Sequence, residues 1–212
     1  MSISLEKRTG INLTKGTSIS LEKSGKQLEH LIVGLNWGAI EKKALWGLVR
    51  NTETVDLDGS AVLFDVTNRQ LEVIYYNNLY SFNRSVKHSG DDREGDLFGD
   101  DDKDNETISI NLTTLDSAVS QIFFFLTSYK GQSFDIVPYS KIRIWETENG
   151  KIKEAFASFN LSAEPIYKGK TGMILAKITR NTNNTWEFKT IGEACPTQKV
   201  TDTITYIQQN YL

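Results

Sequence analysis

Alternating polar and apolar residues mark residues 2–7, 11–15, 18–23 and 107–112. Further short apolar-rich runs follow one another along the chain at residues 30–37, 70–76, 142–145, 155–159, 173–178 and 185–189. Because successive side chains of a strand point to opposite faces of a sheet, this period of two predicts half-buried strands. Turn residues such as Asn181–Asn184 separate the runs at intervals of roughly ten residues. The pattern predicts an all-β fold, a β-sandwich of two antiparallel sheets.

Two segments depart from the alternation. Residues 119–129 contain an unbroken apolar run at Phe123–Phe125, which predicts a central strand buried on both faces. Apolar residues of the tail 197–212 follow the 3.6-residue spacing of a helix. They are Val200, Ile204 and Ile207. We therefore expect a C-terminal helix, and we expect it to close one end of the sandwich.

Two further stretches bear on the organisation of the chain. The hexapeptide Ser-Ile-Ser-Leu-Glu-Lys occurs at residues 2–7 and again at 18–23, which predicts short strands within one domain, because the repeat ends there. Residues 42–50 fit a loop or a short helix, in which Trp46 either packs under the loop or anchors a partner. We expect residues 1–212 to form a single domain.

Composition and charge narrow the function. The chain has 212 residues, 39% hydrophobic and 24% charged, with a net charge of −3 and no basic run, which argues against direct nucleic-acid binding. No apolar run approaches the roughly 18 residues of a membrane span, so we expect no membrane insertion. A lone cysteine, Cys195, and an N-terminus without signal-peptide features predict a cytoplasmic protein. Its two histidines lie in no nucleophile–base pattern, so we expect no enzyme.

The strongest chemical signal is the acidic stretch 88–106. Nine of the 27 acidic residues lie between Asp91 and Glu106 against only Arg93 and Lys103, a net charge of −7. These charges lie within the roughly 8 Å screening length of physiological salt and repel one another. Three glycines in the stretch let the backbone turn tightly, as carboxylates must to converge on one point.

The ligand chemistry favours calcium at this stretch. Many carboxylates, no cysteine and a single histidine at the edge suit Ca²⁺, which takes six to eight oxygens, better than zinc. Asp56 and Asp58, two residues apart at a strand entrance, point to the same face and are a second indication of a cation. Both features also fit a solvated acidic surface without metal.

The acidic stretch is not an EF-hand. Asp100, Asp102 and Asp104 copy the opening of that loop, but Asn105 stands where its glycine belongs, and a strand follows instead of a helix. Any calcium bound here lies between strand ends.

With these motifs in order, the chain resembles the TerD family of bacterial tellurite-resistance and stress proteins. The resemblance rests on Val33-Gly-Leu-Asn-Trp37, Asp56-Leu-Asp-Gly-Ser-Ala61, Tyr75-Tyr-Asn-Asn-Leu79, His88-Ser-Gly-Asp-Asp92, Asp104-Asn-Glu106 and Trp186-Glu-Phe188. It covers essentially the whole chain, and the long acidic loop with the tail 207–212 looks most like the TerZ branch.

The resemblance implies a cytosolic β-sandwich that binds calcium at one end, commonly two ions. The family's acidic positions correspond to Asp56, Asp58, Asp91, Asp92, Asp104, Asn105 and Glu106. To these candidate ligands we add Asp96 and Asp101, which lie where the family's loop varies in length. The implied partners are other tellurite-resistance proteins, in a membrane-associated complex.

The resulting hypothesis is that Ca²⁺ orders the acidic loop, which then forms a partner-binding surface. Two alternatives remain open. One is an interaction module whose acidic loop attracts basic partners without metal. The other is a cyclic-nucleotide-binding protein, as described for some relatives, although the chain has no phosphate-cradling motif.

Overall fold

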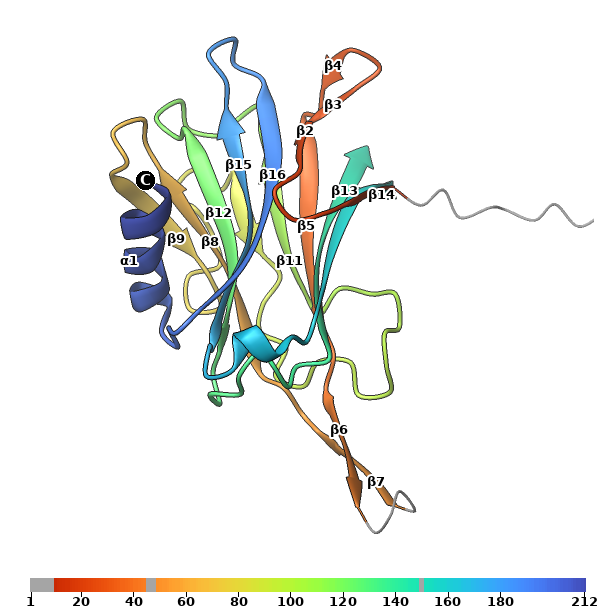
Figure 1. Ribbon diagram of the computed structural model, residues 1–212. Helices are drawn as coiled ribbons and strands as arrows, with labels where there is room; N and C mark the ends of the chain where they lie inside the picture. Colours follow the sequence, from red (N-terminus) through yellow and green to blue (C-terminus); the bar gives the residue numbers. More distant parts are fainter. Residues whose placement is uncertain (1–9, 45–48, 149–150) are drawn as a thin grey trace, which may run out of the picture.

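The computed structural model describes residues 10–44, 49–148 and 151–212, and it folds almost entirely as strands (Figure 1). Two large sheets face each other, as the alternating pattern predicts. The side chains between them form the main core, which contains Leu35, Leu63, Phe124 and Ile144. The expected β-sandwich is therefore confirmed.

Each sheet has six strands. The first has the spatial order β1 (Ile11–Leu13), β14 (Lys151–Ser162), β13 (Tyr139–Glu148), β5 (His30–Trp37), β11 (Glu106–Asn111) and β10 (Val86–His88). The second has the order β2 (Ser18–Ser20), β16 (Trp186–Cys195), β15 (Gly172–Arg180), β12 (Gln121–Ser128), β8 (Leu57–Phe64) and β9 (Gln70–Ile74). Neighbouring strands are antiparallel except β1 and β14, so the first sheet is mixed.

The apolar run at residues 123–125 lies where its two-sided burial predicts. Strand β12 is central in the second sheet, between β15 and β8. Phe124 enters the core between the sheets, whereas Phe123 and Phe125 belong to a second apolar cluster on the outer face of this sheet.

That second cluster is covered by helix α1 (Val200–Tyr211), the predicted C-terminal helix (Figure 1). Its buried residues Ile204 and Ile207 pack with Phe123 and Phe125, and fully burying one such side chain contributes about 1.5–3 kcal/mol. The helix therefore covers a face of the second sheet, and the expectation that it closes an end of the sandwich is wrong. Without the helix, the outer apolar side of β12 would be exposed to water, and the helix buries it.

For the described part of residues 42–50, the prediction of a loop or a short helix is wrong. Residues 42–44 belong to β6 (Ile40–Ala44) and residues 49–50 to β7 (Val49–Glu53), two paired strands between β5 and β8 that extend beyond the sandwich (Figure 1). Trp46 lies outside the described residues. Strands that extend beyond the sandwich need no regular apolar face, so periodicity is a weak guide there.

The second copy of the hexapeptide forms short strands. β2 joins the edge of the second sheet, and β3 (Glu22–Lys23) forms a small hairpin with β4 (Lys26–Gln27). The first copy, at residues 2–7, lies outside the described residues. In the described part of the chain, no helix combines the length and the apolar character needed to cross a membrane.

Candidate metal centre

The acidic loop crosses the end of the sandwich where β5 ends and β8 begins. Two backbone hydrogen bonds fix the loop to the residues that follow β5 and precede β8. Ala39 N–H donates to Asp96 O at 3.0 Å, and Val55 N–H donates to Glu94 O at 3.0 Å. Gly95 has a φ of +69°, and a β-carbon there would lie 2.7 Å from the Trp37 ring. Only glycine fits this position, because the backbone is left-handed and lies directly on the indole.

Three carboxylates converge at this end of the molecule. One oxygen from each of Asp56, Asp58 and Asp91 lies within 4.8 Å of the others. Asp56 precedes β8 and Asp58 is its second residue, with buried Leu57 between them facing the core. Ca²⁺ binds oxygens at about 2.3–2.6 Å, so two oxygens on opposite sides of one ion lie about twice that far apart. The separation of the three carboxylate oxygens is close to this value.

The three groups are unequal in their surroundings. Asp56 and Asp58 are each 6% exposed, whereas Asp91 lies at the surface. Burial, followed by the charges of Glu106, Asp56 and Asp91, raises the pKa of Asp58 to about 7. Burial also raises the pKa of Asp56, against the opposing effect of Lys130. Two buried carboxylates with raised pKa values are stabilised by a cation placed between them.

Two cations of the protein lie beside the cluster. Arg93 Nε is 2.8 Å from Asp91 Oδ2, and Lys130 Nζ is 3.7 Å from Asp56 Oδ2. Both side chains are substantially exposed, so each offsets little of the charge. The contact from Lys130 crosses 74 positions of sequence, and no sequence pattern pointed to it.

Glu106 lies next to the cluster but is held by the protein. Its side chain is fully buried; Oε2 accepts from Gly59 N–H at 2.7 Å, and Oε1 accepts from Asp92 N–H at 3.1 Å. His88 Nε2 lies 3.2 Å from the same Oε2. Because Gly90 N–H donates to His88 Nδ1, the ring proton is on Nε2 and points to Glu106 and Gly59 O. Glu106 therefore joins the loop to both sheets.

A second group of oxygens surrounds the Asn36 side chain. Its Nδ2 lies 2.9 Å from Asp96 Oδ2, 2.7 Å from Lys103 O and 3.2 Å from Asn105 Oδ1. An amide nitrogen has two hydrogens, so three acceptors exceed its capacity. The other amide atom, Asn36 Oδ1, is buried and has no partner among the described residues. Oxygens from separate segments thus converge where a cation could replace the amide hydrogens.

Asp104 is engaged elsewhere. Its Oδ1 accepts from Arg143 Nε at 2.7 Å, and its Oδ2 accepts from Trp145 Nε1 at 2.6 Å. The carboxylate lies directly on Gly34, where a β-carbon would be 2.0 Å from Oδ2. Asp104 therefore fixes the end of the loop to the outer face of the first sheet, and its role as a ligand stays a prediction.

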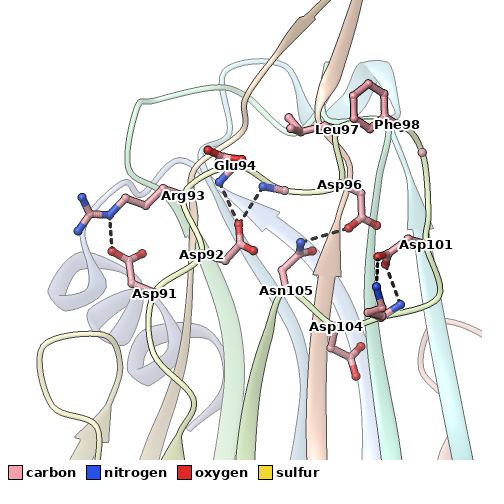
Figure 2. A pocket seen from close by; sticks show the side chains of 13 residues that line it. Asp91, Asp92, Arg93, Glu94, Asp96, Leu97, Phe98, Asp101, Asp104 and Asn105 are labelled. Carbon is pink, nitrogen blue, oxygen red and sulfur yellow. Dashed lines mark hydrogen bonds and ion pairs between the residues drawn. The ribbon is translucent and has the colours of Figure 1, made fainter.

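The remaining candidates lie along the loop. Asp92 Oδ1 accepts from the backbone N–H groups of Glu94 and Gly95, and Asp101 is paired with Lys103 at 3.0 Å. The loop encloses a hollow of about 680 Å³, which Figure 2 shows with Asp91 and Asp92 on one limb and Asp96 and Asp101 on the other. Of the predicted ligands, the structure brings Asp56, Asp58 and Asp91 together, and Asp96 and Asn105 in a separate group.

Comparison with known proteins identifies the family. The model of the TerD domain matches residues 9–204. The chain belongs to the TerD family. It is 33% identical to the tellurium resistance protein TerZ of Serratia marcescens over 193 residues, which cover 91% of this chain and 94% of that protein. It is 32% identical to the stress response protein SCP2 of Bacillus subtilis (strain 168) over 217 residues, which cover 96% and 98% of the two chains.

A solved structure shows the same fold. A homologue of the telluride resistance protein TerD from Streptomyces coelicolor A3(2) superimposes with a TM-score of 0.60 at 18% identity, covering 82% of this chain and 94% of that one. The names of the TerD-family relatives describe resistance and stress proteins and not enzymes. This TerD-family chain is therefore a member of the tellurium-resistance and general stress group.

Proposed function

We propose that this TerD-family protein binds Ca²⁺ at the acidic end of the sandwich, and that the ion orders the loop as a partner-binding surface. The observation that carries the proposal is the meeting of Asp56, Asp58 and Asp91 within 4.8 Å, two of them buried. Burying two carboxylates side by side is costly unless a cation offsets their charge. The two basic side chains beside the cluster, Arg93 and Lys130, are substantially exposed and offset little of this charge.

The donor chemistry selects the ion. The cluster supplies hard carboxylate oxygens and no sulfur, which suits Ca²⁺ or Mg²⁺ and not zinc. Mg²⁺ demands near-ideal octahedral geometry and retains water, whereas Ca²⁺ accepts irregular sets of six to eight oxygens. A loop that contributes a ligand from an exposed surface position, as at Asp91, fits Ca²⁺ better.

We propose a second ion at the Asn36 group. The support is the unpartnered Asn36 Oδ1 beside Asp96, Asn105 and the Lys103 carbonyl. Rotation of the amide by half a turn would present an oxygen to the same space and leave four oxygens facing one ion. The implied partners, other tellurite-resistance proteins in a membrane-associated complex, and a cytoplasmic location belong to the same proposal.

The test is calorimetric titration of metal-stripped protein with Ca²⁺ and with Mg²⁺. We expect Ca²⁺ to bind more tightly, and Asp56→Ala and Asp58→Ala each to remove one binding event. Asp202→Ala, an exposed position on helix α1, is the matched control and should leave the titration unchanged. Absence of calcium heat in the wild-type protein, with a melting temperature unaffected by chelator, would contradict the proposal.

A further inference from the structure

A groove of about 790 Å³ lies on the first sheet, at the end of the molecule opposite the acidic loop. The start of β5, the end of β11 and residues of β10 and β13 form its floor. One wall is the β3–β4 hairpin, which Figure 1 shows at the far end of the sandwich from β6 and β7. The other wall is the turn that precedes β10. No residue of the candidate metal centre lines this groove.

The strand register determines which side chains form the floor. Lys87 on β10, Ser109 on β11 and Ile32 on β5 are neighbours in one row across the sheet. Their chain neighbours, such as Val86 and Ile108, are buried in the core, so these three side chains point to the outer face. An ammonium group, a hydroxyl and an apolar side chain therefore face the groove together.

The groove is positively charged, although the whole chain has a net charge of −3. Its acidic lining residues are Glu29 and Glu146, and its basic ones are Lys23, Lys26, Arg84 and Lys87. With the histidine neutral, this lining has a net charge of +2. Lys23 is already paired with Glu146 and Glu154. The other three basic side chains form no ion pair with any described residue.

Two of these unpaired cations share one aromatic ring. The Arg84 Cζ atom lies 5.4 Å from the centroid of the Tyr80 ring, and Lys87 Nζ lies 5.8 Å from the same centroid. Two positive charges held this close repel each other. An anion bound between them would offset both charges at once.

The backbone at Arg84 does not account for an arginine. Its φ is +59°, in the left-handed region that favours glycine. The turn is fixed by its backbone and by Asn83: Arg84 N–H donates to Ser81 O at 2.9 Å, and Asn83 Oδ1 accepts from Ser85 N–H at 3.0 Å. Neither bond uses the guanidinium group. The arginine is therefore explained by what its side chain does and not by the turn.

The charge and the donors favour phosphate as the ligand. A phosphate monoester carries about −1.5 to −2 at pH 7 and three terminal oxygens that accept hydrogen bonds. A single carboxylate would offset only half of the charge of +2. The planar guanidinium fork matches phosphate oxygens, and lysine adds a point charge.

We propose that this groove binds the phosphate group of a small soluble phosphate ester. Arg84 and Lys87 contact the phosphate oxygens, Lys26 approaches from the hairpin, and Ile32 contacts the organic part of the ligand. The site needs no calcium, so the inference goes beyond the function proposed above and does not depend on it.

The experiment is calorimetric titration of the full chain with inorganic phosphate and with glycerol 3-phosphate, in chelator and at constant ionic strength. We expect both to bind saturably and acetate not to bind. Lys87→Met should weaken the binding of both about tenfold, because a charge-assisted contact is lost. Arg84→Gly should weaken it as much and yet keep or raise the melting temperature without phosphate, since glycine suits the left-handed backbone.

The matched control is Lys199→Met. Lys199 is an exposed lysine at the start of helix α1, which covers the other sheet, and its loss changes the net charge equally. We expect it to leave the phosphate affinity unchanged.

Each outcome decides the inference. Absence of saturable phosphate heat, or equal heat with acetate, overturns it. Wild-type affinity in Arg84→Gly and Lys87→Met, or an equal loss in Lys199→Met, shows that the groove is not the site. A melting temperature lowered by Arg84→Gly shows that the arginine serves the fold and removes it from the proposed contacts.

Two other occupants would also overturn the proposal. Binding only to vesicles of equimolar phosphatidylcholine and phosphatidic acid, without heat from the soluble phosphates, would place the phosphate on a lipid. Self-association that Lys87→Met abolishes, again without phosphate heat, would identify the acidic loop of a second copy as the occupant. None of these results bears on calcium heat, so failure here leaves the proposed function in place.

Discussion

The three carboxylates of the candidate metal centre differ in how the protein offsets their charge. Asp91 has Arg93 at 2.8 Å and Asp56 has Lys130 at 3.7 Å, whereas Asp58 is paired with no lysine or arginine of the described residues. Asp58 is also the group whose pKa is raised to about 7, chiefly by burial. A cation that enters the cluster therefore gains most from Asp58 and must displace Lys130 from Asp56.

The first prediction follows from that competition. Lys130→Met removes a positive charge that the ion would have to displace, so calcium affinity should rise. The lysine is 45% exposed, and screening limits the gain to about threefold, or less than about 1 kcal/mol. Calorimetric titration measures it. Lys168→Met, at the same end of the molecule, is the control for the change in net charge, and a matching rise there would refute the direct competition.

The second prediction is that the effect of Asp58→Asn on the free energy of unfolding changes sign when calcium is added. In metal-free protein, Asp58→Asn removes a buried charge repelled by its neighbours and should raise the free energy of unfolding by about 1–2 kcal/mol. In calcium it removes a ligand and should lower the stability instead. Thermal melts in both conditions test this, with about 2–4 °C expected per kcal/mol. A shift of the same sign in both would show that the ion does not contact Asp58.

Some of this site could be predicted from single residues and some could not. The two-residue spacing of Asp56 and Asp58 and the glycines of the loop predict convergence, and the structure brings both to Asp91. Arg143, which holds Asp104, is 39 residues away in sequence, and nothing local to either residue indicates the pair. Long-range ion pairs depend on strand order, which the periodicity of one strand does not specify.

At the scale of elements, periodicity predicts burial better than it predicts neighbours. The spacing of Val200, Ile204 and Ile207 correctly predicts helix α1, but the same apolar stripe would suit an end or a face of the sandwich. The two-sided burial of β12 is the signal that a second layer is needed outside the second sheet. The described strands of the β6–β7 pair give no such signal, since they extend beyond the two sheets (Figure 1).

The third prediction concerns the attachment of helix α1. The hydroxyls of Tyr206 and Tyr211 donate to the two oxygens of Glu193 at 2.7 and 2.6 Å. The hydrogen bond to Glu193, followed by burial, raises the pKa of Tyr206 to about 12. A group whose pKa is higher in the folded state stabilises the fold below its unfolded value and loses that contribution as pH rises through the folded value.

The protein should therefore lose stability as pH rises from about 10 to 12, by about 1 kcal/mol from Tyr206 after allowance for screening. Tyr206→Phe should lose less over the same window, while starting less stable at neutral pH. Thermal melts against pH measure both slopes. Tyr80→Phe is the control, because the Tyr80 ring contacts the Arg84 guanidinium at 5.4 Å instead of a carboxylate. If the stability of Tyr206→Phe falls with pH as steeply as that of the wild type, the hydrogen bond from Tyr206 to Glu193 is not the cause of the loss.

At the scale of the whole molecule, the candidate centre joins the two sheets. Asp56 and Asp58 belong to the start of β8 in the second sheet, whereas Asp91 belongs to the loop between β10 and β11 of the first. Buried Glu106, on β11, already bridges the same gap through the backbone of Gly59 on β8. An ion here would add a further polar link between the two layers.

The fourth prediction follows, because an ion that bridges both sheets binds the folded chain and not the unfolded one. Its stabilisation should grow with the logarithm of calcium concentration, reaching about 2.7 kcal/mol at a hundredfold excess over the dissociation constant of one site. For a chain of this size, that is about 5–11 °C in melting temperature. Calorimetric melts at stepped calcium concentrations measure it, and two ions would double the slope.

The shape of the transition distinguishes a bridge from a loop that merely becomes ordered. If the ion joins the sheets, one cooperative transition should move as a whole, and Asp56→Ala should remove the share of the movement that this ion supplies while Asp202→Ala preserves all of it. Ordering of the loop alone would slow proteolysis between Asp91 and Glu106 and leave the main transition in place. That second result would confine calcium to the loop and separate its binding from the stability of the sandwich.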